Sequence, residues 1–263
     1  MLNKAYAPLF FLLLSFFLTP SLSYSEVYSS ATINSRLDTP DLDDARGVLI
    51  NYHKDSNSID KTIEIIDVIL KQEPDNVEAL NFLSRVWLTS GHAKARSKDE
   101  MIASFEKGLE VSKKAVEIAP NDPDTHFYYV ANLASLGEVK GILNSLFMLP
   151  EVRKELDTIL ELDPNHAYGL AMNGALYYFL PSLLGGDIQI SEIYIRRSLS
   201  LDPHMSSAKF YLALNLRKQK RYDEAIEVLF DLVNDKEPSF YPDWYLNRKY
   251  AIVLISKIRE EKK

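Results

Sequence analysis

The chain has 263 residues, of which 46% are apolar, 25% charged and 11% aromatic. This composition is typical of a folded globular protein and excludes a wholly disordered or fibrous one. Thirty Lys and Arg against 37 Asp and Glu give a net charge of −7, which argues against nucleic-acid binding, because that requires basic side chains to replace phosphate counterions. The absence of cysteine excludes disulfides, thiolate nucleophiles and cysteine-ligated zinc.

The first 25 residues have the pattern of a secretory signal peptide. Their apolar run, over 9–18, has ten residues, whereas a helix that spans a membrane needs roughly 20. Ser23 and Ser25 are small residues at the −3 and −1 positions of a cleavage site. Cleavage predicts a periplasmic or secreted protein with no remaining membrane anchor, followed by a flexible Ser/Thr-rich leader over 26–40. The alternative is an uncleaved membrane anchor.

A recurring pattern divides the rest of the chain: a helical run, an acidic or small residue, a proline and a polar turn. Four such prolines are spaced by 46, 44 and 39 residues: Pro74, Pro120, Pro164 and Pro203. Pro40 lies 34 residues before the first of them, and a last period of 34 runs from Ser206 to Ser239. Thirty-four residues is the period of the tetratricopeptide repeat, a helix–turn–helix unit. Each proline would stop the second helix of a unit.

Large and small side chains recur within these periods at the positions which that repeat requires. The matching residues are Leu80, Leu83, Ser84 and Trp87 in the second period, Leu170, Gly174 and Tyr177 in the fourth, and Leu212, Ala213, Leu216, Tyr222 and Ala225 in the fifth. The small residue lets two helices approach closely, and the large ones fill the groove between them.

The chain therefore resembles the tetratricopeptide family over 41–239. The resemblance implies an all-α, right-handed α-solenoid of about five helix pairs, within a domain over 41–263. A closing helix is expected near 242–261, with Tyr241, Trp244 and Tyr245 sealing the end of the core. The alternative is a generic helical bundle.

Three of the periods are longer than 34 residues, by 12, 10 and 5. The extra residues fall between the two helices of a unit, over 92–100, 137–149 and 179–187. They would lie along one edge of the solenoid, where insertions often form a binding surface; the alternative is lengthened helices with no ligand role. The second insertion is apolar, with Pro150 at a helix start, and predicts a short extra helix that packs on this edge.

The third insertion ends in a Gly-Gly-Asp turn. Pro181 is expected to stop the first helix, and Gly185 and Gly186 permit a turn with positive φ. Asp187 is expected to cap the next helix by accepting hydrogen bonds from its free N–H groups. The alternative is that this turn holds an anion or the backbone of a ligand.

A narrower resemblance covers residues 149–187. With its apolar segment, its Pro-Glu helix start and its Pro-x-x-x-Gly-Gly-Asp turn, this stretch is similar to exported tetratricopeptide proteins of the T-component family of TRAP transporters. The resemblance implies a periplasmic protein that forms homo-oligomers, partners a periplasmic substrate-binding protein and has an apolar cavity for a small ligand. Members of that family often carry a lipidated cysteine, which this chain lacks.

A binding groove is expected on the concave surface, which the first helix of each unit would line with every third or fourth residue. The candidate residues are Asn81, Arg85, Tyr128, Asn132, Tyr168, Ala175, Tyr178, Phe210 and Arg217. Tyrosine offers a large contact area with a polar end, so such a groove suits an extended peptide or an amphiphilic small molecule with an acidic end. The alternative is that these rings pack against the next unit or the closing helix.

No motif of an enzyme is present. The five histidines form no His-Glu-x-x-His or similar ligand pair, and neither a P-loop nor a Gly-x-Ser-x-Gly occurs. We therefore expect no catalytic residue, metal or cofactor. The sequence predicts an exported binding or adaptor protein, with a role beside a TRAP-type transport system implied by the resemblance. The alternative is a scaffold for cell-envelope assembly with no small ligand.

Overall fold

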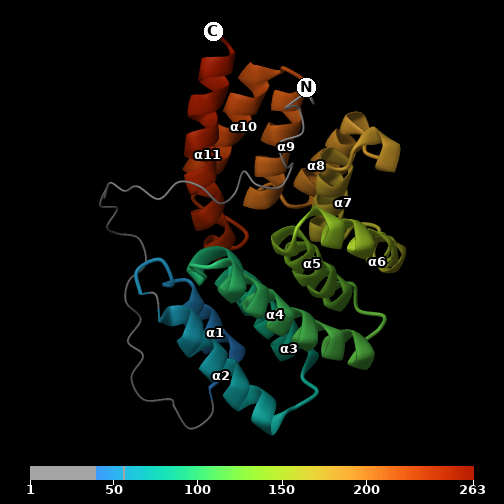
Figure 1. Cartoon of the computed structure of the whole chain (residues 1–263). Coiled ribbons are helices and arrows are strands. Elements are labelled where there is room, and N and C mark those ends of the chain that lie inside the picture. The colour runs from blue at the N-terminus through green and yellow to red at the C-terminus, as the bar shows by residue number, and fades with distance from the viewer. Residues whose placement is uncertain (1–39, 56) are drawn as a thin grey trace.

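The computed structural model describes residues 40–55 and 57–263, so the predicted signal peptide and nearly all of the leader lie outside the described residues. The described part is helical and contains no strand. Ten helices form five neighbouring pairs and an eleventh closes the solenoid (Figure 1). The pairs are α1 (Leu42–Leu49) with α2 (Ser58–Gln72), α3 (Val77–Thr89) with α4 (Lys98–Ile118), α5 (Pro123–Lys140) with α6 (Ile142–Leu162), α7 (Ala167–Phe179) with α8 (Ile188–Leu201), and α9 (Ser206–Lys218) with α10 (Tyr222–Asn234), followed by α11 (Tyr241–Glu261). The prediction of an all-α solenoid with a closing helix is confirmed.

Polar residues after the repeat prolines start the first helix of three units. Asn76, Asp122 and His166 each accept a hydrogen bond from a backbone N–H in the first turn of α3, α5 and α7, at 2.9 Å in each case. Such caps satisfy N–H groups that have no partner within the helix. The proline and the capping residue together therefore set the repeat boundaries that the sequence predicts.

The apolar core is distributed along the solenoid. One cluster joins α1, α2 and α3 around Ile66 and Val86, and another joins the last helices around Leu216, Leu229 and Ile258. All five side chains are fully buried. Each unit thus packs mainly on its neighbours, as is typical of repeat proteins.

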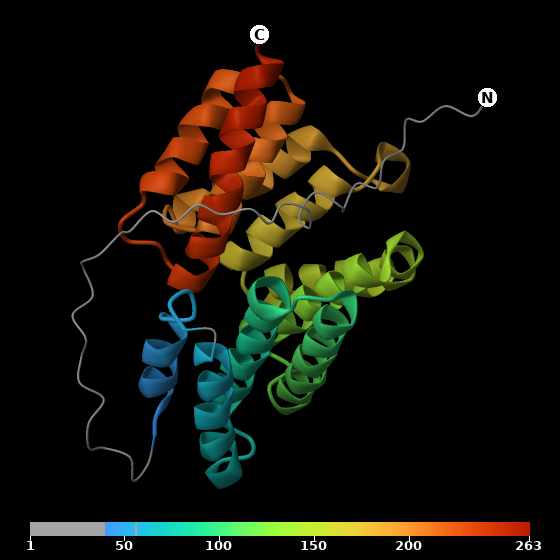
Figure 2. The same cartoon turned by 60° about the vertical axis from the view of Figure 1, so that its left-hand side comes forward.

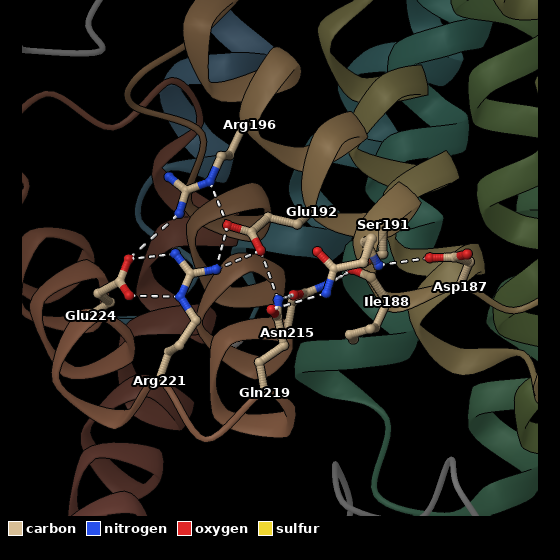
Figure 3. Close-up of polar contacts among 10 residues, drawn as sticks. Asp187, Ile188, Ser191, Glu192, Arg196, Asn215, Gln219, Arg221 and Glu224 are labelled. Atoms are coloured by element: carbon tan, nitrogen blue, oxygen red, sulfur yellow. Dashed lines mark hydrogen bonds and ion pairs between the residues drawn. The ribbon is translucent and has the colours of Figure 1, made fainter.

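A polar cluster joins the fourth unit to the fifth (Figure 3). Glu192 on α8 is only 8% exposed, and its carboxylate accepts hydrogen bonds from Arg196 (2.7 Å), Gln219 (2.7 Å) and Arg221 (2.8 Å). Burial opposes the charge on Glu192, but these three donors outweigh it and lower its pKa. Arg221 also binds Glu224 of α10, so this cluster fixes α8 against the start of α10.

The second insertion does not form the short extra helix that the sequence predicts. Gly141 has φ of 106° and reverses the chain within a single residue, after which α6 runs unbroken for 21 residues. Pro150 lies inside α6 on an exposed position, so its missing N–H costs one hydrogen bond without breaking the helix. The extra residues therefore lengthen α5 and α6, as the alternative stated above has it for the structure; a binding role of this insertion stays a prediction.

The third insertion has the structural role expected of it. The chain leaves α7 at Leu180, passes Pro181 and forms a single 3₁₀ turn, η3 (Ser182–Leu184). Gly185 has φ of 82°, and Asp187 accepts hydrogen bonds from the N–H groups of Gln189 and Ile190, at 2.8 and 3.0 Å.

Gly186 is required for a different reason from the one predicted. It does not adopt a positive φ. A Cβ at this position would lie 1.7 Å from the carbonyl oxygen of Leu180, so glycine permits a close approach of two backbone segments.

The aromatic residues of α11 divide between two contacts. Trp244 packs on the C-terminal core and its indole N–H donates to the Leu232 carbonyl at 2.8 Å, as predicted. Tyr245 and Tyr241 do not seal that core, but contact the connection between α1 and α2, where the Tyr245 ring lies 5.9 Å from that of Tyr52. The first unit and the closing helix therefore touch, as Figure 2 shows at the base of α11.

Candidate protein-interaction surfaces

Three of the predicted groove residues meet on the concave face. Arg85 of α3 donates hydrogen bonds to the hydroxyl oxygens of Tyr128 on α5 and Tyr168 on α7, both at 3.3 Å. Its side chain is only 13% exposed. The first helices of three successive units thus place one guanidinium between two phenols.

Arg85, Tyr128 and Tyr168 form what we call the Arg85 site, and residues of the same chain already occupy it. The ring centroid of Phe240 lies 3.4 Å from the Arg85 guanidinium carbon, and a carboxylate oxygen of Asp243 lies 3.1 Å from Arg85 Nη2. Both residues belong to the segment that enters α11. The sequence alternative in which groove residues pack against the closing helix therefore holds for Arg85.

Three other predicted groove residues are buried between helices. Asn81 and Ala175 are each 7% exposed, and Asn132 is fully buried. The Asn132 amide donates to Ser84 Oγ at 2.9 Å and fills the space left by Gly108, whose Cβ would lie 2.0 Å from Asn132 Oδ1. These residues therefore pack the interior and are not open to a ligand.

The remaining predicted residues line the face near α11. Tyr178 and Phe210 are half-buried, with the ammonium of Lys218 4.8 Å from the Tyr178 ring centroid. Arg217 pairs with the closing helix, where its Nε donates to Glu261 of α11 at 2.9 Å. A ligand role for these three residues stays a prediction.

Glu138 is a titratable group of this face that the sequence analysis did not identify. It lies near the end of α5, and burial raises its pKa from 4.5 to about 7. Burial raises the pKa values of Tyr211 on α9 and Tyr250 on α11, and the nearby Glu138 carboxylate raises both further. A glutamate in a helical pattern is normally solvated, so no sequence signal indicates its burial.

Glu138→Gln is expected to stabilise the protein at pH 8 by about 2 kcal/mol and to change little at pH 4. The pKa is higher in the folded state than in the unfolded one, so the protonated form stabilises the fold, and this contribution is lost as the pH rises through about 7. Urea unfolding at both pH values measures the difference. The exposed Glu110 provides the control, and an equal gain for Glu110→Gln would contradict the prediction.

A shallow depression beside the Arg85 site is lined by Tyr168, Phe240 and Asp243 among others. It encloses essentially no volume that a water molecule could fill, whereas ligand sites usually hold about 300–1,000 Å³. Within residues 40–55 and 57–263 no group of carboxylates and histidines could hold a metal ion. No helix in that part is long and apolar enough to cross a membrane.

Four exposed large apolar side chains gather at the start of α6. Ile142, Leu143, Leu146 and Phe147 are 70, 67, 41 and 83% exposed. They lie in the second of the predicted insertions. Leu183, in the third insertion, is 95% exposed. The second and third insertions, which the sequence predicts to lie along a binding edge, thus present exposed apolar side chains.

The family model "Regulator of microtubule dynamics protein 1-3" matches residues 49–183, which is just over half of the chain. This chain belongs to that family. The matched part contains the Arg85 site and the exposed start of α6, whereas Phe240 and Asp243 lie beyond it. No curated protein matches the sequence.

Solved structures support the fold of this family member. The chain is 17% identical to TTC0263, a thermophilic TPR protein of Thermus thermophilus, over 81% of this chain and 100% of that one, with a TM-score of 0.58. It is 15% identical to MamA over 72% and 88% of the two chains, with a TM-score of 0.40. The first likeness shows a tetratricopeptide-type fold, and the second is too weak to carry an argument. No comparison supports the T-component resemblance, which stays a prediction.

Proposed function

We propose that this protein is an interaction adaptor that binds an apolar segment of a partner protein on the first two turns of α6. The observation that carries this proposal is the exposure of four large apolar side chains there, Phe147 above all at 83%. Soluble proteins seldom leave several neighbouring apolar side chains open unless another molecule covers them.

The pattern of this surface suits a helix or extended segment of a partner. Ile142 and Leu146, and likewise Leu143 and Phe147, are four residues apart and so lie above one another on the helix. No charged residue occurs between Gly141 and Pro150. An uncharged apolar patch with one aromatic side chain resembles the centre of a protein interface, where charged residues are depleted.

A partner protein fits this surface better than an anionic membrane. Binding to such a membrane depends on clustered Lys and Arg, whereas this chain has a net charge of −7. Lys140, the basic residue just before the patch, already pairs with Glu106 at 2.7 Å.

Phe147→Ser is expected to weaken partner binding about 50-fold, because a fully buried Phe contributes roughly 2–3 kcal/mol. A photo-crosslinking residue at position 147 identifies the partner in cells by mass spectrometry. The affinity of the purified partner for the wild type and for Phe147→Ser is then measured by calorimetric titration. Ile193→Ser is the matched control, because Ile193 on α8 is 67% exposed but lies outside the patch.

Equal affinities for wild type and Phe147→Ser would contradict the proposal. So would binding to anionic vesicles that Phe147→Ser abolishes, because the occupant would then be a lipid surface. The family description suggests assembled microtubules as one purified probe, and the T-component resemblance suggests a TRAP substrate-binding protein as another.

We further propose that the adaptor is exported and acts after removal of residues 1–25. The charge, length and small-residue flank of this segment support the proposal. The intact mass of protein purified from its own cells tests it: a mature chain starting near Glu26 is expected, and a full-length chain in the cytoplasm would contradict it.

A further inference from the structure

The segment entering α11 occupies the Arg85 site in the manner of a bound peptide. The centroid of the Phe240 ring lies 3.4 Å from the guanidinium carbon of Arg85. The Asp243 carboxylate accepts a hydrogen bond from one Arg85 N–H at 3.1 Å. The two side chains come from positions three apart, which one turn of helix brings to the same side. They lie 155 and 158 residues from Arg85 in the sequence.

The chemistry of the Arg85 site explains this choice of side chains. A guanidinium can stack its face on an aromatic ring while its edge donates to a carboxylate. Two other N–H groups of Arg85 donate to Tyr128 and Tyr168, so these phenols hold the guanidinium in one orientation. The Arg85 site is therefore selective for an aromatic and an acidic side chain together.

We propose that the Arg85 site is a peptide-recognition site for segments with an aromatic residue and, three positions later, an acidic one. In this structure the chain's own residues 240–243 fill it. A partner segment of the same chemistry takes their place. This site lies on the concave face and is distinct from the α6 surface of the proposed function.

Two observations indicate that the resident segment is replaceable. The Asp243 side chain is 38% exposed, and its contact with Arg85 is a single hydrogen bond of 3.1 Å. The family match at 49–183 includes Arg85, Tyr128 and Tyr168 but not the segment that covers them.

The test uses the full chain and a labelled peptide of its own residues 239–245, SFYPDWY. A tethered segment competes at an effective concentration near millimolar, so the wild type is expected to bind this peptide weakly. Phe240→Ala combined with Asp243→Ala vacates the Arg85 site and is expected to strengthen binding at least tenfold by fluorescence anisotropy. Adding Arg85→Lys is expected to remove that gain, because lysine lacks the planar group.

Equal binding by wild type and the double variant would overturn the proposal, as would binding that Arg85→Lys leaves unchanged. No binding by a double variant with native circular dichroism would also overturn it. If the double variant does not fold, the single variant Asp243→Asn must still bind more tightly than wild type. A peptide with serine in place of Phe240 must bind more weakly. Phe147→Ser must leave peptide affinity unchanged, which separates this site from the α6 surface.

Discussion

Gly174→Val is expected to lower the free energy of unfolding by about 3 kcal/mol, the upper end of the usual cost of overpacking a core. Gly174 lies where α7 crosses α8. A Cβ there would lie 2.4 Å from Ile195 Cγ1 and 3.0 Å from the carbonyl oxygen of Ser191. The Ile195 side chain is fully buried and cannot swing aside, so α8 itself must move away from α7.

Thermal unfolding measures this effect, with an expected fall in Tm on the order of 10 °C for a chain of this size. Gly47→Ala is the matched control. Gly47 lies in α1, and a Cβ at this position would meet nothing within 4 Å. Since alanine favours helix by about 1 kcal/mol over glycine, this control is expected to be neutral or stabilising. A Gly174→Val protein that melts with the wild type would show that the close approach of α7 and α8 is not needed.

Lys209→Met is expected to cost about 3 kcal/mol, because it leaves a buried carboxylate without its cation. The Lys209 ammonium lies 2.7 Å from Asp235 and 2.8 Å from Asp231. The Lys209 and Asp235 side chains are only 6% and 4% exposed. His204 also contacts Asp235, at 2.8 Å, and remains as a hydrogen-bond partner of this carboxylate in the Lys209→Met variant.

The control for this loss is an ion pair on the surface. Lys262 pairs with Asp223, and these side chains are 49% and 80% exposed, so Lys262→Met is expected to cost at most about 0.5 kcal/mol. Urea unfolding of both variants at neutral pH provides the comparison. Equal losses would contradict the assignment of Lys209 as a buried partner. Lys209→Met with Asp235→Asn is expected to recover part of the stability, because the variant then buries no unpaired charge.

The interaction surfaces were predictable only in part. The insertions were located from the lengths of the periods, and the start of α6 in the second of them is exposed. Arg85, Tyr128 and Tyr168 were placed on one face by their positions in the repeat, and they do meet. The same rule failed for Asn132, which is fully buried, because its amide fills the space left by Gly108 and donates to Ser84 Oγ.

Local patterns in the sequence predict most of the helices, their pairing and the turns between them, although not the single long α6. These features depend on nearby residues: prolines that end helices, polar residues that cap them, and small and large side chains at a period near 34. What covers Arg85 follows only from the packing of the whole chain. Phe240 and Asp243 reach Arg85 because the curvature of the whole solenoid brings α11 back to the first unit, where Tyr52 donates to the Pro242 carbonyl at 3.1 Å. That curvature is the sum of small rotations between successive units, and no local pattern of residues records it.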